Sequence, residues 1–197
     1  KIAIYTLGCK VNQYETQAME RELVRRGHAL VPFEDPADAY IINTCTVTAV
    51  SDKKCRNIIR RARKSAPEAV VAVCGCYAQT DPEAVRALGV DLVSGSAGRM
   101  AFLDQLEKLL HAKGGQVITV DNAMSRRDFE RLPAGGAAGR TRAMLKVEDG
   151  CVNFCTYCII PYARGPVRSL PLSDAAAQAE KLAGEGYKEL VLTGIEI

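Results

Sequence analysis

The sequence predicts an α/β protein, with an amino-terminal doubly wound parallel-sheet domain followed by the beginning of a second βα series. Two observations support this prediction. Along residues 1–120, short apolar runs rich in β-branched residues alternate with amphipathic, helix-periodic stretches. The periodicity stops over residues 121–142 and then resumes as another strand-and-helix pattern. We therefore predict a first domain over 1–120, a linker over 121–142 and a truncated second domain over 143–197.

The elements of the first domain follow in strict alternation. A strand over 2–7 precedes a helix that we expect to begin at Asn12, because Asn12 and Glu15 form a capping-box pattern, and to end near Arg26, before Gly27. Further strands are expected at 40–42, 69–74, 91–93 and 117–120, and further helices at 50–64, 82–88 and 100–110. Strands and helices in this order form βαβ units and a parallel sheet.

The second part repeats the pattern after a linker. Residues 133–139 are rich in Gly and Ala, which is typical of a flexible connection. We expect a strand at 143–147, an irregular cysteine-bearing loop over 150–170, a helix at 173–183 and a strand at 189–192. The chain starts with Lys1 rather than Met and stops where a strand should pass into a loop, so we expect a piece of a longer protein.

Composition and charge limit the class of protein. With 197 residues, 48% of them hydrophobic and 25% charged, the chain can bury a core, which excludes a disordered chain or a coiled coil. The 26 Lys and Arg exceed the 23 Asp and Glu by only 3, so any nucleic-acid surface must be local. No apolar run reaches the roughly 18 residues of a membrane span, and no secretory leader is present, so we expect a cytoplasmic protein.

Three of the eight cysteines are close in sequence. Without a secretory leader, cysteines favour metal or catalytic use over disulfides. Cys151, Cys155 and Cys158 follow the spacing C-x3-C-x2-C, so their thiolates should converge on one metal centre. A structural zinc site needs a fourth ligand, and the two histidines, His28 and His111, lie far away in sequence. A 4Fe-4S cluster held by three thiolates keeps one iron open for a substrate or cofactor.

A second set of three cysteines is dispersed along the first domain. Cys9, Cys45 and Cys76 each follow an expected strand, and loops after parallel strands gather at the carboxyl edge of the sheet. The three thiols should therefore form another cluster site. Cys55 lies on an apolar helical stripe and should pack in the core. Cys74 alternates with Cys76, so on one continuous strand both side chains would project to similar sides.

The cysteine pattern and its context resemble a known family. The C-x3-C-x2-C loop is similar to that of the radical S-adenosylmethionine superfamily, and residues 6–13, 42–45 and 75–79 closely resemble the amino-terminal domain of its methylthiotransferases. The resemblance covers essentially the whole chain. It implies two 4Fe-4S clusters, at Cys9, Cys45 and Cys76 and at Cys151, Cys155 and Cys158. It also assigns Cys74 to packing, since the family ligand follows Gly and precedes Ala-Gln or similar residues.

The resemblance also implies a fold, a cofactor and a reaction. Residues 143–197 would begin a radical S-adenosylmethionine β/α barrel, partial and TIM-like. Tyr157 would lie beside the adenine of S-adenosyl-L-methionine, and Thr193 and Gly194 would approach its amino group or ribose. Arg164 and Arg168 are candidates to contact carboxylate or phosphate. The implied activity adds a methylthio group to C2 of N6-threonylcarbamoyladenosine next to the tRNA anticodon. The implied partners are tRNA and an electron donor such as flavodoxin or ferredoxin, without a membrane.

Basic residues give two candidate RNA surfaces. Lys53, Arg56, Arg60 and Arg63 line one face of the expected helix 50–64, where they could bind RNA phosphates or form an ordinary solvated surface. A group of arginines around the linker could also meet RNA or keep the linker soluble: Arg126, Arg127, Arg131, Arg140 and Arg142.

Other functions remain open from the sequence. Within the family, the substrate could instead be isopentenyladenosine in tRNA or an aspartate of a ribosomal protein. Outside it, the chain could be a non-catalytic iron-sulfur module that binds RNA, or a structural zinc module.

Overall fold

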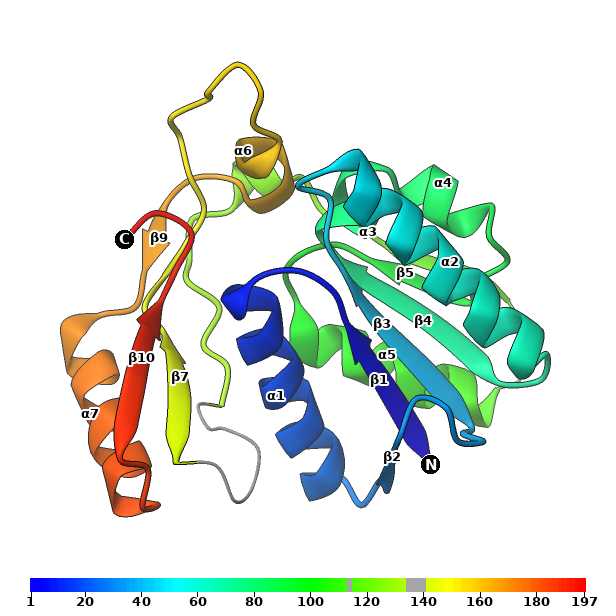
Figure 1. Cartoon of the computed structure of the whole chain (residues 1–197), viewed down its shortest axis with the longest axis horizontal. Helices are drawn as coiled ribbons and strands as arrows, with labels where there is room; N and C mark the ends of the chain where they lie inside the picture. Colours follow the sequence, from blue (N-terminus) through cyan, green and yellow to red (C-terminus); the bar gives the residue numbers. More distant parts are fainter. Residues whose placement is uncertain (113–114, 134–140) are drawn as a thin grey trace.

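A six-stranded parallel sheet forms the larger part of the molecule (Figure 1). The computed structural model describes residues 1–112, 115–133 and 141–197. The strands are β1 (Ile2–Thr6), β2 (Leu30–Val31), β3 (Ala39–Thr44), β4 (Val70–Gly75), β5 (Leu92–Ser94) and β6 (Val117–Thr119). Their order is β2-β1-β3-β4-β5-β6, and every adjacent pair is parallel. The short strand β2 was not expected from the sequence.

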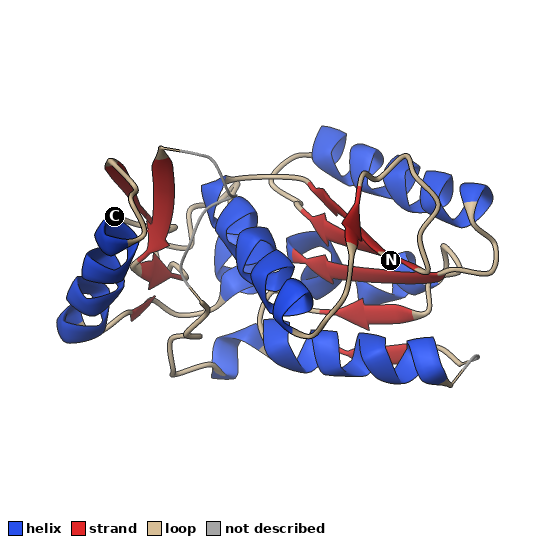
Figure 2. Cartoon of the chain, turned by 90° about the horizontal axis from the view of Figure 1, so that it is seen from below, coloured by secondary structure: helices blue, strands red, loops and turns tan. Residues whose placement is uncertain are grey.

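Helices cover both faces of this sheet, which confirms the doubly wound prediction (Figure 2). Helices α1 (Lys10–Arg25) and α5 (Arg99–His111) pack against one face. Helices α2 (Ala49–Ser65), α3 (Cys76–Thr80) and α4 (Pro82–Arg86) pack against the other. Strand residues alternate between the two cores, so that Ile41 packs with α1 and α5 while Ile42 packs with α2. Burial on both faces explains why β3 is apolar at consecutive positions.

The second part of the chain contains one βαβ unit. Strands β7 (Arg142–Lys146) and β10 (Glu189–Thr193) are parallel, and helix α7 (Leu172–Gly184) lies between them in sequence. Between β7 and α7 come β8 (Glu148–Asp149), α6 (Ile160–Arg164) and β9 (Arg168–Ser169), with β8 and β9 antiparallel. One βαβ unit suits several α/β folds, so a barrel beginning here stays a prediction.

Helix α1 packs against both parts of the molecule. Its residues Met19 and Leu23 belong to the sheet core, whereas Tyr14 and Ala18 pack with Leu132 and with residues of β7 and α7. The connection between the parts includes the 3-10 helix η1 (Ala123–Ser125). The Gly-rich segment 134–139 of the expected linker lies outside the described residues.

The start of α1 differs from the prediction. The helix begins at Lys10 with Cys9 at the N-cap position, and Asn12 and Glu15 lie inside it, each almost completely buried. Gly8, with a φ of +113°, turns the chain out of the β1 extension early enough for this start. The capping-box interpretation was therefore wrong, and both polar side chains have another role. Across the described residues, no helix combines the length and apolarity that crossing a membrane requires.

Candidate functional site

Three cysteine-bearing loops meet at the carboxyl edge of the sheet. Cys9 is the N-cap residue of α1 after β1, Cys45 directly follows β3, and Cys76 directly follows β4 as the first residue of α3. Strands β1, β3 and β4 are neighbours in the sheet. Cys9 and Cys45 line one cavity of about 380 Å³. Because these strands are parallel, all three residues lie at the same edge of the sheet, as expected from the sequence.

Two glycines let the loops approach one another. A Cβ on Gly8 would lie 2.9 Å from the Cβ of Cys45 and 3.2 Å from its Sγ. A Cβ on Gly75 would overlap the carbonyl oxygen of Thr44 and lie 2.7 Å from the Oδ1 of Asn43. Both glycines have positive φ, +113° and +101°, which side chains with a Cβ rarely adopt. The loops can therefore approach this closely only because glycine occupies both positions.

The side-chain amide of Asn12 forms hydrogen bonds with two of these loops. Its Nδ2 donates hydrogen bonds to the carbonyl oxygens of Leu7 and Thr44, both at 2.9 Å. Its Oδ1 accepts a contact from the Sγ of Cys9 at 3.6 Å. One buried side chain on α1 thus connects the loop after β1 with the residue before Cys45.

Arg164 extends this connection to the third loop and comes from the second part of the chain. It lies at the end of α6, fully buried, six positions after Cys158. Its Nε donates to the Sγ of Cys76 at 3.2 Å, and its Nη2 donates to the Oδ1 of Asn12 at 2.7 Å. The residue therefore contacts protein groups of the first cysteine set rather than pointing toward solvent.

Buried charges surround this arginine. Glu15 on α1 accepts from Arg99 of α5 at 3.0 Å, from Lys146 of β7 at 3.2 Å and from Arg164. Asp149 accepts from Lys146 at 2.7 Å. Burial alone would raise the pKa of Glu15, but the three cations hold that pKa well below its ordinary value. Glu15 is thus a buried carboxylate at the contact between the two parts of the chain.

The sulfur of Cys76 differs in its partners from the two packing cysteines. Burial raises the pKa of Cys76, and the nearby Arg164 opposes that rise. Cys55 and Cys74 are fully buried in the two opposite cores of the sheet. Burial raises their pKa values to about 12 and about 11, and Cys55 donates to the carbonyl of Cys45 at 3.2 Å. Their assignment to packing is confirmed.

The second cysteine set lies in the loop between β8 and α6. Cys155 is exposed, and Cys151 and Cys158 are half-buried. A turn brings the amide of Cys158 to 2.9 Å from the carbonyl of Cys155, and Phe154 has a φ of +46°. This loop is the uppermost segment in Figure 1 and lies beyond α6.

The donor atoms of the two cysteine sets suit iron-sulfur clusters. Within the described ranges, no group of three His, Cys, Asp or Glu side chains is placed to hold a single metal ion. In a 4Fe-4S cluster with three cysteine ligands, each thiolate binds a different iron. The donors are soft sulfur atoms, and Cys9 and Cys45 border a cavity that Gly8 also lines. The residues present therefore suit clusters with three cysteine ligands.

The three residues predicted to contact the cofactor are Tyr157, Thr193 and Gly194. Tyr157 is 90% exposed, so its ring is free on the loop surface. Thr193 is buried at the end of β10, and a Cβ on Gly194 would lie 2.7 Å from the Oε2 of Glu148. That same Oε2 accepts from the amide of Glu196 at 2.8 Å. The roles of Tyr157, Thr193 and Gly194 toward a cofactor stay predictions.

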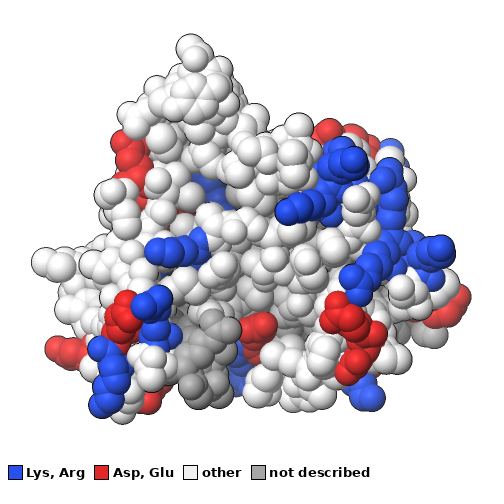
Figure 3. Space-filling model, in the orientation of Figure 1, with Lys and Arg blue, Asp and Glu red and all other residues white. Residues whose placement is uncertain are grey.

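The basic face of α2 is only partly free to bind a ligand. Figure 3 shows Lys and Arg side chains gathered over this side of the molecule. Lys53 and Arg60 are exposed, whereas the Nη1 of Arg56 donates to the hydroxyl of Tyr77 at 3.2 Å. Arg63 uses its donors within the fold, on Asp91 and on three carbonyl oxygens, those of Pro67, Ala69 and Gly89. Arg63 therefore fits a structural role, and the expectation that it contacts RNA is not supported by its surroundings.

Of the linker arginines, Arg126 is also engaged within the protein. It donates to the Oγ of Ser96 at 2.8 Å, to the Oε1 of Gln79 at 2.6 Å and to both carboxylate oxygens of Asp121. Arg140 lies outside the described residues.

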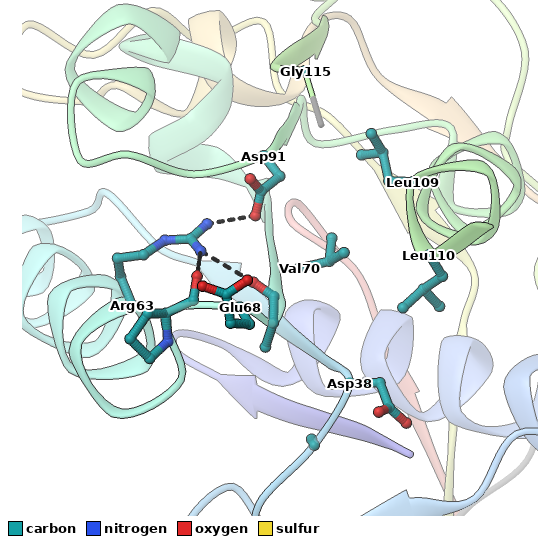
Figure 4. Close-up of a pocket in the computed structure, with 11 residues that line it drawn as sticks. Asp38, Arg63, Glu68, Val70, Asp91, Leu109, Leu110 and Gly115 are labelled. Atoms are coloured by element: carbon teal, nitrogen blue, oxygen red, sulfur yellow. Dashed lines mark hydrogen bonds and ion pairs between the residues drawn. The ribbon is translucent and has the colours of Figure 1, made fainter. Parts of the chain in front are cut away.

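A further hollow, of about 430 Å³, lies at the opposite end of the sheet from the cysteines (Figure 4). Its walls come from the segments just before β3, β4, β5 and β6 and from the end of α5. Arg63, Glu68 and Asp91 line it, with Arg63 bound to Asp91. Ligands of parallel sheets bind at the carboxyl edge, which is where the cysteines lie.

Sequence reasoning missed the polar residues that join the loops. Asn12 and Glu15 were interpreted as helix caps, and Arg99, Lys146 and Arg164 were not connected with the first cysteine set. Their partners are up to 152 positions away in sequence, as in the pair of Arg164 and Asn12. The available signal was the presence of Asn and Glu at positions that the apolar stripe of α1 turns toward the core.

Comparison with known proteins agrees with the resemblance. Residues 1–95 match a family described as "Uncharacterized protein family UPF0004". The chain is 46% identical over 198 residues to the threonylcarbamoyladenosine tRNA methylthiotransferase MtaB of Bacillus subtilis, covering 98% of the chain and 43% of that protein. It is 40% identical to the protein of that name from Aquifex aeolicus, covering 100% of the chain and 48% of the relative. The Thermotoga maritima protein of the same name is 37% identical, with 100% and 44% covered.

The chain thus spans less than half the length of these curated relatives. The matches reach across both cysteine sets and both parts of the fold, since they cover nearly the whole chain. Residues 1–95 therefore match the family UPF0004, and the chain is similar over nearly its whole length to part of the proteins named MtaB.

Proposed function

We propose that the chain is part of a radical S-adenosylmethionine enzyme that adds a methylthio group to C2 of N6-threonylcarbamoyladenosine beside the tRNA anticodon. The relatives named above carry threonylcarbamoyladenosine tRNA methylthiotransferase as their name. The structural observation that supports the proposal is the meeting of the Cys9, Cys45 and Cys76 loops, joined by Asn12 and Arg164. A tRNA substrate also places the proposed activity in the cytoplasm.

In this proposal the two cysteine sets hold two 4Fe-4S clusters. Cys9, Cys45 and Cys76 bind one cluster, and Cys151, Cys155 and Cys158 bind the other. When bound, S-adenosyl-L-methionine would supply the methyl group and the radical, and the first cluster would carry or activate the sulfur of the new C–S bond. The further partners of this reaction are an electron donor such as flavodoxin or ferredoxin and a sulfur donor, which the sequence leaves open.

The protein's own residues position and enclose these groups. Asn12 holds the loops of Cys9 and Cys45 at a fixed separation, and Arg164 holds the sulfur of Cys76. Gly8 and Gly75 allow the loops to close on one another. Tyr157 would stack beside the cofactor adenine, with Thr193 and Gly194 near its amino group or ribose. Residues 143–197 would then form the first segment of the barrel that carries the cofactor.

The exposed basic residues of α2 are the proposed contact with tRNA. Lys53 and Arg60 remain accessible, and Lys54 lies at the rim of the cavity lined by Cys9 and Cys45. Positive side chains beside that cavity would attract RNA phosphates toward the site. Phosphate contacts position the RNA, while recognition of the modified base requires contacts to the base itself.

The function is tested in a bacterial strain that lacks the full-length gene. Expression of the full-length protein should restore 2-methylthio-N6-threonylcarbamoyladenosine in hydrolysed tRNA, as measured by mass spectrometry. The same protein with Cys76→Ala should not, whereas Cys74→Ala should. Restoration of a methylthio group on isopentenyladenosine instead would refute the substrate. Restoration by the Cys76→Ala protein would refute the role of the first cysteine set.

A further inference from the structure

Arg164 and its neighbour Gly165 together link the two cysteine sets. Arg164 is six positions beyond Cys158, and the carbonyl of Gly165 accepts a hydrogen bond from the amide of Cys151 at 3.0 Å. On its other side, the guanidinium reaches the sulfur of Cys76 at 3.2 Å. A short stretch of chain thus contacts the backbone of one set and a sulfur atom of the other.

The geometry of the guanidinium fixes this contact. Nε donates to the Sγ of Cys76, Nη1 to Glu15 and Nη2 to Asn12. The guanidinium is planar, so these three directions are held in one rigid fork. Since the side chain is fully buried, no water competes for the donors. The position of the Cys76 sulfur is therefore set relative to Asn12, which also holds the loop of Cys9.

The charge around Arg164 favours an anionic sulfur. Four buried cations, Arg99, Lys146, Arg164 and Arg168, face the two carboxylates Glu15 and Asp149 in this network. Positive charges therefore outnumber these carboxylates, and an unpaired buried charge is costly. A thiolate at Cys76, as in a metal-bound cysteine, would offset one of them. A neutral thiol at the same place would not.

We propose that Arg164 is a positioning residue for the cluster at Cys9, Cys45 and Cys76, holding the Cys76 thiolate and raising the reduction potential of that cluster. This inference rests on the proposed function, because it requires a cluster at the first cysteine set. A hydrogen bond and a positive charge at a ligand sulfur stabilise the reduced cluster, which carries one more negative charge. The first cysteine set is then incomplete without a residue from outside the 1–95 family region.

The test uses this chain with Cys151, Cys155 and Cys158 changed to Ala, so that any cluster occupies the first set. The protein is reconstituted anaerobically with iron and sulfide, and a redox titration is followed by electron paramagnetic resonance. In this background Arg164→Gln should lower the reduction potential. We expect at least a tenfold change in the ratio of oxidised to reduced cluster, about 59 mV for one electron. Arg164→Lys keeps the positive charge but loses the planar set of donors, so the reduction potential should shift by less than in Arg164→Gln.

A matched control distinguishes contact with sulfur from general burial. Arg168 is also buried and lies 3.5 Å from Asp149, but its Nη1 donates to the carbonyls of Arg164 and Pro166 and not to sulfur. Arg168→Lys should leave the potential unchanged. If circular dichroism shows that the Arg164→Gln protein is unfolded, the shift in reduction potential of the Arg164→Lys protein decides the question. Loss of iron from a folded Arg164 variant would also support the positioning role.

Two results would overturn the inference in distinguishable ways. A folded, iron-loaded Arg164 variant with an unchanged potential and spectrum would refute the role of Arg164 alone. A parent chain that takes up no iron, or whose iron is unaffected by Cys76→Ala, would refute the proposed cluster and, with it, this inference.

Discussion

The buried contact between the two parts of the chain is tested by Glu15→Gln. Glu15 is completely buried and accepts from Arg99 at 3.0 Å, from Lys146 at 3.2 Å and from Arg164. Glutamine keeps the shape of the side chain but removes its charge, and its amide nitrogen cannot accept from a cation. Removing one partner of a buried ion pair costs about 3–5 kcal/mol, because the remaining charges stay buried without compensation. We expect the free energy of unfolding to fall by about that amount.

The assay is urea denaturation followed by circular dichroism. A matched control is Glu83→Gln on α4, whose partner Arg86 lies at 2.7 Å while the two side chains are 67% and 48% exposed. An exposed pair contributes about 0–1 kcal/mol, so this control should change little. In the background of Glu15→Gln, Lys146→Met should cost less than it does alone, because it removes one of the uncompensated cations. A loss below about 1 kcal/mol for Glu15→Gln would refute the account of this network, since exposed pairs already reach that value.

Four further predictions concern Tyr14, Gly75, Arg63 and the exposed basic residues of α2. Burial, with help from Glu15, raises the pKa of Tyr14 to about 12, so the folded chain keeps a proton that the unfolded chain loses above about pH 10. The free energy of unfolding should therefore fall between about pH 10 and 12. In urea titrations at each pH, Tyr14→Phe should remove the part of this fall that is due to Tyr14. Gly75→Ala should cost at least about 1–3 kcal/mol in unfolding free energy, against a smaller cost for Gly27→Ala, where φ is also positive but no atom lies within 4 Å. Arg63→Gln should lower stability by about 1–3 kcal/mol without changing tRNA affinity. Changing Lys53 and Arg60 to Gln in the full-length protein should instead weaken tRNA binding and flatten its salt dependence by nearly one unit per lost contact.

Most of the amino-terminal fold could be predicted from the sequence because its signals are local. Strands buried on both faces are continuous apolar runs, and the helices between them carry apolar stripes. This is why β3, β4, α2 and α5 lie within a few residues of their expected bounds. The short elements β2, α3 and α6 were missed because runs of two to five residues carry no measurable period.

The position of the cysteines could be predicted because it follows from topology. Once the strands are parallel, residues after β1, β3 and β4 must share one edge. Which polar side chains join them could not be predicted. Asn12 and Glu15 have the spacing of a capping box, and the local pattern is the same whether the pair caps a helix or lies inside it. Only the packing of the second part against α1, through Arg164, decides between these roles.

Iron content tests the central claim, that two separate cysteine sets hold two clusters, most directly. The anaerobically reconstituted chain should bind about eight irons, four per cluster. Cys76→Ala should retain about four, and Cys74→Ala, which changes a packing residue only two positions away, should retain about eight. Full iron in the Cys76→Ala chain, or loss of half the iron in the Cys74→Ala chain, would contradict the assignment of the first cluster to Cys9, Cys45 and Cys76.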